Sequence, residues 1–198
     1  MNLSVKNWNM ILAAALIPAA AVGAYIWLNK RRNADLPVAP HVELDRYLGE
    51  WYEIARMPVR YEKGCYGTRA IYAKRDDGDI DVLNICHKGS PTGELEIAKG
   101  KACVVDTETN ARLKVSFFWP FSGDYWILEV GPQYEYALVG TPDRSGMWIL
   151  SRTPEMDKAL SSKLIRRAEE LGFNTFKLIF TRHQRTRSRT TVGESATV

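Results

Sequence analysis

The chain has 198 residues, of which 45% are hydrophobic and 25% are charged, so it is long enough for one domain of ordinary size with a real core. The formal charge is +4, but residues 1–35 and residues 181–198 each hold four basic residues and one acidic residue, which leaves 19 basic and 21 acidic residues between 36 and 180. Because the central part is slightly acidic and only the ends are basic, we exclude nucleic acid as a partner.

An uncharged apolar stretch lies near the start of the chain. Trp8 to Leu28 comprises 21 residues without a charge and is flanked by basic residues. It is long enough to span a bilayer as a helix, and Val22 and Ala24 also supply the small residues typical of a signal-peptide cleavage site. Residues 1–28 are therefore predicted to be a signal peptide or a transmembrane anchor, two alternatives that both direct the chain to a membrane. No cysteine precedes Cys65, so lipidation of a cysteine just after this stretch is not expected.

The rest of the chain divides into three predicted parts. Residues 29–43 are polar and contain prolines, which is typical of a linker. Residues 44–180 are the predicted folded domain. Residues 181–198 have no apolar period and are predicted to form a disordered basic tail.

Short β-like runs fill most of the predicted domain. Turn signals such as DDGD, GSPTG and PDRSG separate eight of them at regular intervals, which favours an all-β sandwich or barrel over βαβ units. The predicted strands are 51–57, 66–74, 79–86, 95–105, 111–118, 124–130, 135–141 and 147–151.

The period then changes to that of a helix. Thr153 is the expected N-cap, Pro154 takes the first helical position, and Gly172 ends the segment. A ninth short strand is expected within FNTFKLIF, residues 173–180.

Side-chain alternation predicts a hollow interior. The inward positions of the predicted strands mix small residues with aromatic rings and one asparagine, whereas large aliphatic residues would fill a sandwich core. Small residues beside isolated polar groups leave room for a guest, and an eight-stranded barrel holds one small ligand. The candidate ligand-binding residues from this alternation are Ala70, Tyr72, Val82, Asn84, Ala98, Leu113, Val115 and Phe117.

Three segments resemble the lipocalin family. YLGEWYEIAR carries a Gly-x-Trp signature at Gly49 and Trp51, and YEYALVG, which starts at Tyr134, is similar to the second conserved segment. WILSRTP is similar to the third, with Arg152 as its basic residue. The sequence KVSFFWPFSGDYWIL resembles the bacterial outer-membrane lipocalins and the apolipoprotein D-like branch in particular.

The resemblance implies an eight-stranded antiparallel up-and-down barrel, closed at one end, with a C-terminal α-helix packed on its outside. It implies that Gly49, Trp51 and Arg152 form the barrel floor and that Trp126 faces the cavity. Alternation along the predicted strand 124–130 does not decide which residues face inward, so Tyr125 and Ile127 are an alternative inward pair.

The function that the resemblance implies is a carrier. The guest would be a fatty acid, a phospholipid or a lysophospholipid, held in the envelope of a Gram-negative bacterium. The expected location is periplasmic or membrane-anchored, with the outer membrane as one option. No cofactor is expected.

The three cysteines predict one disulfide. Cys65 and Cys86 lie eleven residues before and ten residues after the turn near Asp76, so a hairpin would bring them together. Two buried thiols are the alternative. Cys103 is out of phase with the inward positions of its strand and is expected to face outward, where it could link two chains as a homodimer or simply fill apolar space.

An enzyme is the rival interpretation. Some lipocalins use a cavity cysteine as a nucleophile, and Cys65 starts a comparable strand, but no neighbouring residue in the sequence would activate it. His41, His87 and His183 are scattered without a metal or hydrolase motif. We therefore predict a binding protein without catalytic residues or a metal site. A membrane-anchored interaction module with a plugged barrel is a further alternative.

Overall fold

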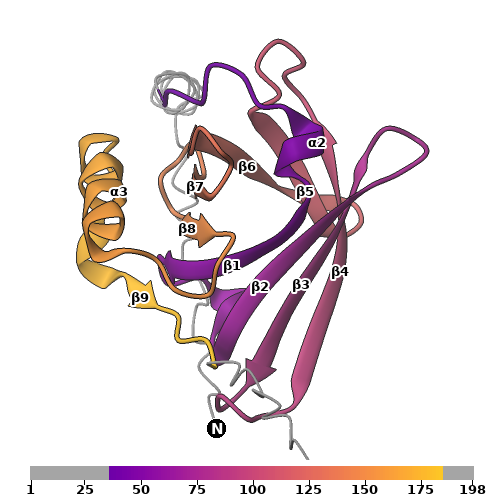
Figure 1. The fold of residues 1–198 in the computed structure, drawn as a ribbon. Coiled ribbons are helices and arrows are strands. Elements are labelled where there is room, and N and C mark those ends of the chain that lie inside the picture. Colours follow the sequence, from indigo (N-terminus) through magenta and orange to yellow (C-terminus); the bar gives the residue numbers. More distant parts are fainter. Residues whose placement is uncertain (1–35, 185–198) are drawn as a thin grey trace, which may run out of the picture.

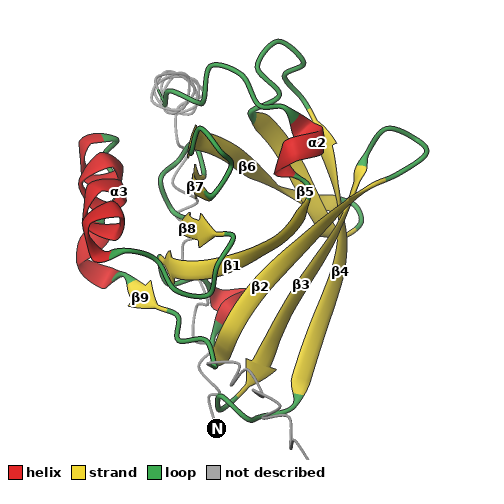
Figure 2. Cartoon of the chain, in the orientation of Figure 1, coloured by secondary structure: helices red, strands yellow, loops and turns green. Residues whose placement is uncertain are grey.

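Eight antiparallel strands wrap around one interior in the computed structural model, which describes residues 36–184 (Figures 1 and 2). The strands follow one another around the sheet in the order β2 to β8 and then β1, and a pairing between β1 and β2 closes the barrel. The predicted up-and-down barrel is thereby confirmed. The strands are β1 (Gly49–Arg56), β2 (Cys65–Lys74), β3 (Ile80–Lys88), β4 (Leu95–Val104), β5 (Arg112–Phe118), β6 (Phe121–Val130), β7 (Tyr136–Gly140) and β8 (Met147–Ser151).

The register of the hairpins decides which side chains face inward. In the β2–β3 hairpin, Ala70 lies opposite Asn84 and Tyr72 lies opposite Val82. Because side chains alternate across a strand, these four residues share one face of the sheet. That face is the inner face of the barrel.

The N-terminal part of the described chain packs against one end of the barrel. Ala39 N donates to Ile127 O (2.9 Å), Val42 N donates to Thr109 O (2.7 Å), and the side chain of Leu36 is fully buried. The linker prediction is therefore wrong for residues 36–43. Backbone amides of this stretch donate to the barrel, and its apolar side chains are buried against it. A short helix, α2 (Leu44–Tyr47), follows and leads into β1.

The predicted signal peptide or anchor at residues 1–28 and the linker residues 29–35 lie outside the described residues. Within residues 36–184, none of the helices combines the length and the apolar character that crossing a bilayer requires.

The C-terminal helix, α3 (Lys158–Glu170), begins later than the sequence predicts. Its N-cap is Asp157 and not Thr153, because the Asp157 carboxylate accepts from the amides of Ala159 (2.9 Å) and Leu160 (3.1 Å). Thr153 instead donates its hydroxyl to Glu155 O (2.7 Å) in the connecting loop. Figure 1 shows α3 on the outside of the barrel.

The segment after α3 is less extended than predicted. Residues 175–177 form a 3-10 turn, η2, and only Ile179–Phe180 pair with β1 as β9. The strand does not extend over the whole of residues 173–180, because the side chain of Phe173 points inward and is buried in the apolar cluster beneath α3.

The first residues of the predicted tail are also part of the fold. Thr181 N donates to Ile54 O (3.0 Å), and Gln184 Nε2 donates to Pro91 O (2.7 Å). The tail prediction is wrong for residues 181–184 because partners on the barrel satisfy polar groups that look unpaired in the sequence. Residues 185–198 lie outside the described residues.

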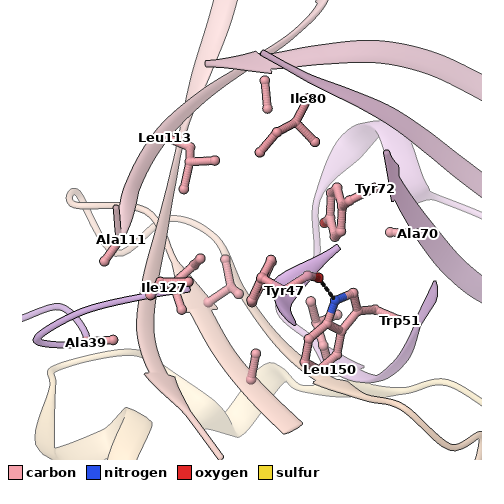
Figure 3. Close-up of a cluster of buried hydrophobic side chains, with 14 of the residues drawn as sticks. Ala39, Tyr47, Trp51, Ala70, Tyr72, Ile80, Ala111, Leu113, Ile127 and Leu150 are labelled. Carbon is pink, nitrogen blue, oxygen red and sulfur yellow. Dashed lines mark hydrogen bonds between the residues drawn. The ribbon is translucent and has the colours of Figure 1, made fainter. Parts of the chain in front are cut away.

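Two apolar clusters hold the domain together. One lies between the outer face of the barrel and α3 and includes Leu164, Ala168 and Leu171. The other fills the closed half of the barrel interior, where Trp51, Tyr47 and Leu113 are buried (Figure 3). The second cluster is the floor on which any guest in the barrel would rest.

Candidate ligand-binding cavity

The floor of the barrel is centred on Trp51, whose side chain is fully buried. Its Nε1 donates to Tyr47 O (2.7 Å; Figure 3), and the guanidinium of Arg152 lies 3.8 Å from the centre of its ring. Gly49 has a φ of 92°, a conformation that other residues rarely adopt, at the entry to β1. The three residues that the resemblance assigns to the floor therefore lie together, with the guanidinium of Arg152 over the ring of Trp51 and close to Gly49.

The guanidinium of Arg152 also forms hydrogen bonds with the backbone at the closed end of the barrel. It donates to the carbonyl oxygens of Glu50 (2.7 Å) and Leu48 (2.8 Å). Further acceptors are the carbonyl oxygens of Arg46 (2.7 Å), Tyr47 (3.2 Å) and Tyr134 (3.2 Å). One side chain thus donates to five backbone carbonyl groups at the closed end, one of which, Tyr47 O, also accepts from Trp51 Nε1.

Three tyrosine hydroxyls form a chain directly above the floor. Tyr47 and Tyr125 are joined by a hydrogen bond of 2.8 Å, and Tyr72 donates to Tyr125 at 3.0 Å. Burial is the main cause that raises the pKa of Tyr72 to about 12. The three phenols therefore stay neutral at physiological pH, and they present a polar but uncharged surface to the interior.

Two adjoining cavities lie above the tyrosines. The inner one has a volume of about 130 Å³ and the outer one about 440 Å³. Both are lined by Thr68, Asn84, Val115 and Phe117, so they form one continuous space that widens toward the open end. Its wall is mainly apolar, as a site for an apolar guest requires.

Seven of the nine candidate ligand-binding residues line this space. Asn84, Val115 and Phe117 face both cavities, Ala98 faces the outer one, and the inner cavity is lined by Ala70, Tyr72 and Val82. Leu113 does not line it, since it is buried deeper, in the cluster at the closed end.

Trp126 lies on the opposite face of its strand. The register pairs Leu113 with Tyr125 and Arg112 with Trp126, so Tyr125 points inward and Trp126 outward. The indole lies beneath the guanidinium of Arg112 (4.8 Å) and packs toward the helix-side cluster. The placement follows the alternative parity, in which Tyr125 and Ile127 face the interior.

The disulfide between Cys65 and Cys86 is present, and both cysteines line the outer cavity. Cys103 is a free, partly buried cysteine whose cross-strand partner is Lys114, on the outer face. Because Cys65 is oxidised to a disulfide, it offers no thiolate for nucleophilic attack.

A buried charged cluster beside the cavity was not identified from the sequence. Arg56 Nε lies 3.2 Å from the carboxylate of Glu53 and 2.9 Å from that of Glu62. Trp148 Nε1 donates to Glu62 Oε1 (3.0 Å), and both carboxylates line the inner cavity. Simple alternation would put Glu53 and Arg56 on opposite faces, but a register shift between Glu53 and Ala55 brings them together.

The cluster contains two carboxylates and only one cation. Burial, followed by the charge of Glu62, raises the pKa of Glu53 well above its usual range. Glu53 therefore tends to keep its proton in the folded protein, and the carboxylate of Glu62 lies closer to Arg56 Nε than that of Glu53.

Replacing Glu53 by glutamine is expected to stabilise the protein at neutral and higher pH, by on the order of 1 kcal/mol. A carboxyl whose pKa is raised in the folded state contributes stability at low pH and loses it as pH rises from its unfolded pKa through its folded pKa. The gain should therefore shrink as pH falls toward about 3, where the wild-type carboxyl is protonated in both states. Urea unfolding at several pH values measures it.

The control for this substitution is Glu50→Gln on the same strand. Glu50 pairs with Arg69 through side chains that are more than a third exposed, so its replacement should change stability by about 0.5 kcal/mol or less. Equal effects of both substitutions, or a loss of stability in Glu53→Gln at high pH, would contradict the account of the buried pair.

The comparisons with known proteins agree with this geometry. Residues 42–183 match the lipocalin-like domain. The chain is 42% identical over 143 residues to the outer membrane lipoprotein Blc of Vibrio cholerae, covering 72% of this chain and 83% of that protein. It is 32% identical over 160 residues to bovine (Bos taurus) apolipoprotein D, covering 73% and 81% of the two chains.

Among solved structures, insecticyanin from the tobacco hornworm Manduca sexta superposes with a TM-score of 0.62 at 21% identity, covering 76% of this chain and 86% of that one. This likeness supports the fold. The matched domain and the sequence identity to the relatives establish that the chain belongs to the lipocalin family.

Proposed function

We propose that this protein carries an acyl lipid in its barrel, within the envelope of a Gram-negative bacterium. The guest is a fatty acid, a phospholipid or a lysophospholipid. The observation that carries the proposal is the continuous, mainly apolar space above the Trp51 floor, open at one end. Relatives named outer membrane lipoprotein support an envelope location.

Burial of the acyl chain supplies the affinity. Each methylene transferred from water contributes about 0.8 kcal/mol, so ten contribute about 8 kcal/mol before the costs of ordering are subtracted. The polar end of the guest has partners where the two cavities meet. Thr68 Oγ1 is buried there without a hydrogen-bond partner among residues 36–184, and the side chain of Asn84 lies on the same wall.

The observations favour a carrier over the two alternatives. An enzyme that uses a cavity thiol would need Cys65, which is bonded to Cys86. An interaction module with a plugged barrel would not need the hollow interior that Ala70, Ala98 and their neighbours leave open.

Titration with a lysophospholipid or a fatty acid, followed by tryptophan fluorescence, tests the proposal. The signal should come from Trp148, which lines the inner cavity, and not from Trp126, which lies outside it. We expect Trp148→Phe to lose most of the quenching and Trp126→Phe to keep it. The absence of saturable quenching with every acyl lipid would overturn the proposal.

An aromatic hairpin at the mouth is suited to collecting the guest from a membrane. Phe118, Trp119 and Phe121 are 81%, 91% and 76% exposed, and the neighbouring Phe117 lines the cavity. Exposed aromatic residues of this kind favour the interface between lipid headgroups and acyl chains. We propose that this hairpin contacts the membrane while the guest enters or leaves.

Replacing Trp119 and Phe118 together by serine is expected to slow lipid transfer from vesicles by about tenfold. The affinity for a lipid added as monomers should fall by at most about twofold, because Trp119 lines neither cavity and Phe118, which lines the outer one, is 81% exposed. Stopped-flow transfer of a fluorescent lipid measures the rate. Phe176→Ser is the matched control, since Phe176 is 98% exposed on η2. An unchanged transfer rate in the double variant would count against membrane contact by the hairpin.

A further inference from the structure

The residues that follow β9 form a strap across the outside of the barrel. The strap comprises residues 181–184. Thr181 N donates to Ile54 O (3.0 Å), His183 Nε2 bonds to Glu53 O (2.7 Å), and Gln184 Nε2 donates to Pro91 O (2.7 Å). Figure 1 shows this segment running from β9 toward the end of β2 where that strand begins. The hydroxyl of Thr181 also donates to the carboxylate of Glu53, so four hydrogen bonds fix the strap to β1 and to the loop between β3 and β4.

A pocket of about 210 Å³ lies between the strap and the barrel. Four of the side chains that line it are basic and none is acidic. It shares only Arg69 with the acyl cavity, and it is far more polar. The lining residues are Tyr52, Gly67, Arg69, His87, Pro91, Pro154, Arg182, His183 and Gln184.

The positive charge of this strap pocket is only partly balanced. Arg69 pairs with Glu50 at 2.6 Å. Arg182 has no carboxylate partner within ion-pair distance among residues 36–184. A second arginine therefore adds an uncompensated charge beside the first, and a bound anion would relieve their repulsion.

The two histidines each keep one ring nitrogen free. A backbone carbonyl can only accept, so Nε2 of His183 donates to Glu53 O, and its Nδ1 has no hydrogen-bond partner among the residues that the structure describes. His87 is held in the same way, because its Nδ1 donates to Gly93 O (2.9 Å). Its Nε2 has no hydrogen-bond partner among residues 36–184. When the ring of His183 is charged, its Nδ1 carries a proton and can donate to an anion.

Burial lowers the pKa of His183, and the charge of Arg69 lowers it further. The charged and titratable groups around this ring are the side chains of Tyr52, Arg69, His87 and Arg182, with the Glu53 carboxyl on the inner side of β1. An anion held by the arginines would oppose both effects, because it stabilises the imidazolium.

We infer that the strap pocket binds a phosphate-type dianion, either inorganic phosphate or the phosphate monoester of a lipid headgroup. Arg69 and Arg182 supply the planar donors that suit phosphate oxygens, and the imidazole of His183 adds a donor as pH falls. The site is distinct from the acyl cavity, from which β1 separates it. Arg69 lines both, and Glu53 connects them, because its carboxyl lines the acyl cavity and its carbonyl oxygen is bonded to His183.

Calorimetric titration of the full chain in a non-ionic detergent with inorganic phosphate, at constant ionic strength, tests the inference. We expect one saturable site per chain. Arg182→Gln should weaken it by about tenfold or more, because a hydrogen bond to a charged group is lost. Arg166→Gln removes the same charge from an exposed position on α3 and should leave the affinity unchanged. No saturable binding, or equal weakening in both variants, would overturn the inference.

A second titration uses sulfate, which stays a dianion over the range tested. Its affinity should rise about tenfold between about pH 8 and about pH 5.5, and His183→Gln should remove most of that rise while keeping a donor for Glu53 O. A pH dependence that is unchanged in this variant would contradict the role of the histidine.

Vesicles distinguish the two sources of the anion. Binding to phosphatidylcholine vesicles that requires added phosphatidic acid and depends on Arg182 indicates a headgroup, whereas saturation by inorganic phosphate alone indicates the free ion. Quenching of Trp148 by an acyl lipid, measured in Arg182→Gln, separates this inference from the proposed function. Quenching should be intact in that variant, so either site can fail without the other.

Discussion

Replacing Val115 by tryptophan is expected to weaken acyl-lipid binding by about a hundredfold or more while the barrel stays folded. Val115 lines both cavities and lies where they meet. An indole at this position would occupy space that several methylenes of the guest need, and about four lost methylenes correspond to about 3 kcal/mol. The added ring has room, because the neighbouring space is hollow, so the usual cost of overpacking is small. Fluorescence titration measures the affinity and urea unfolding measures the stability.

Lys114→Trp is the matched control for this variant. Lys114 is the preceding residue on the same strand, and it faces outward, where it pairs with Asp124 at 3.0 Å. The same indole on the outer face should leave lipid affinity within about twofold of the wild type, since only an exposed ion pair is lost. An unchanged affinity in Val115→Trp would show that the guest does not use this part of the interior.

Replacing Arg152 by methionine is expected to lower the free energy of unfolding by about 3 kcal/mol. The change keeps an apolar side chain of similar length but removes all the hydrogen bonds that the guanidinium donates to backbone carbonyls at the closed end. It also removes the cation above the ring of Trp51, a contact worth about 1 kcal/mol. Urea unfolding measures the loss, and lipid affinity of the folded fraction should change little.

Arg112→Met tests whether the loss of stability expected for Arg152→Met is specific to the barrel floor. Arg112 also lies over an indole, that of Trp126, at 4.8 Å, and it forms one ion pair with Asp106. Its replacement should cost about 1 kcal/mol. Equal losses in the two variants would mean that the network of Arg152 with the backbone adds nothing beyond a cation on an aromatic ring.

The sequence predicts the barrel well because its signals are local. Turn residues separate the eight strands, and alternation within each hairpin puts Ala70, Tyr72 and Asn84 on one face. The closed end follows from the family resemblance, which pairs Trp51 with Arg152 across 101 positions that no local pattern connects. The disulfide is predicted from distance to a turn, which is again a local quantity.

The remaining features depend on contacts between distant parts of the chain. The inward parity of Tyr125 depends on its pairing with Leu113 across the hairpin, which the composition of β6 does not reveal. The cluster of Glu53, Arg56 and Glu62 needs a bulge in β1 and the fold of the following loop. The strap looks like part of a polar tail because its hydrogen-bond partners lie 93 to 130 positions earlier in the chain.

The most direct test of the central claim is native mass spectrometry of the protein purified from bacterial envelopes without added lipid. The account predicts a bound species whose mass matches one acyl lipid per barrel, and predicts its loss in Val115→Trp but not in Lys114→Trp. A barrel that is free of any acyl species in the wild type, and that stays free after incubation with fatty acid or lysophospholipid, would contradict the account.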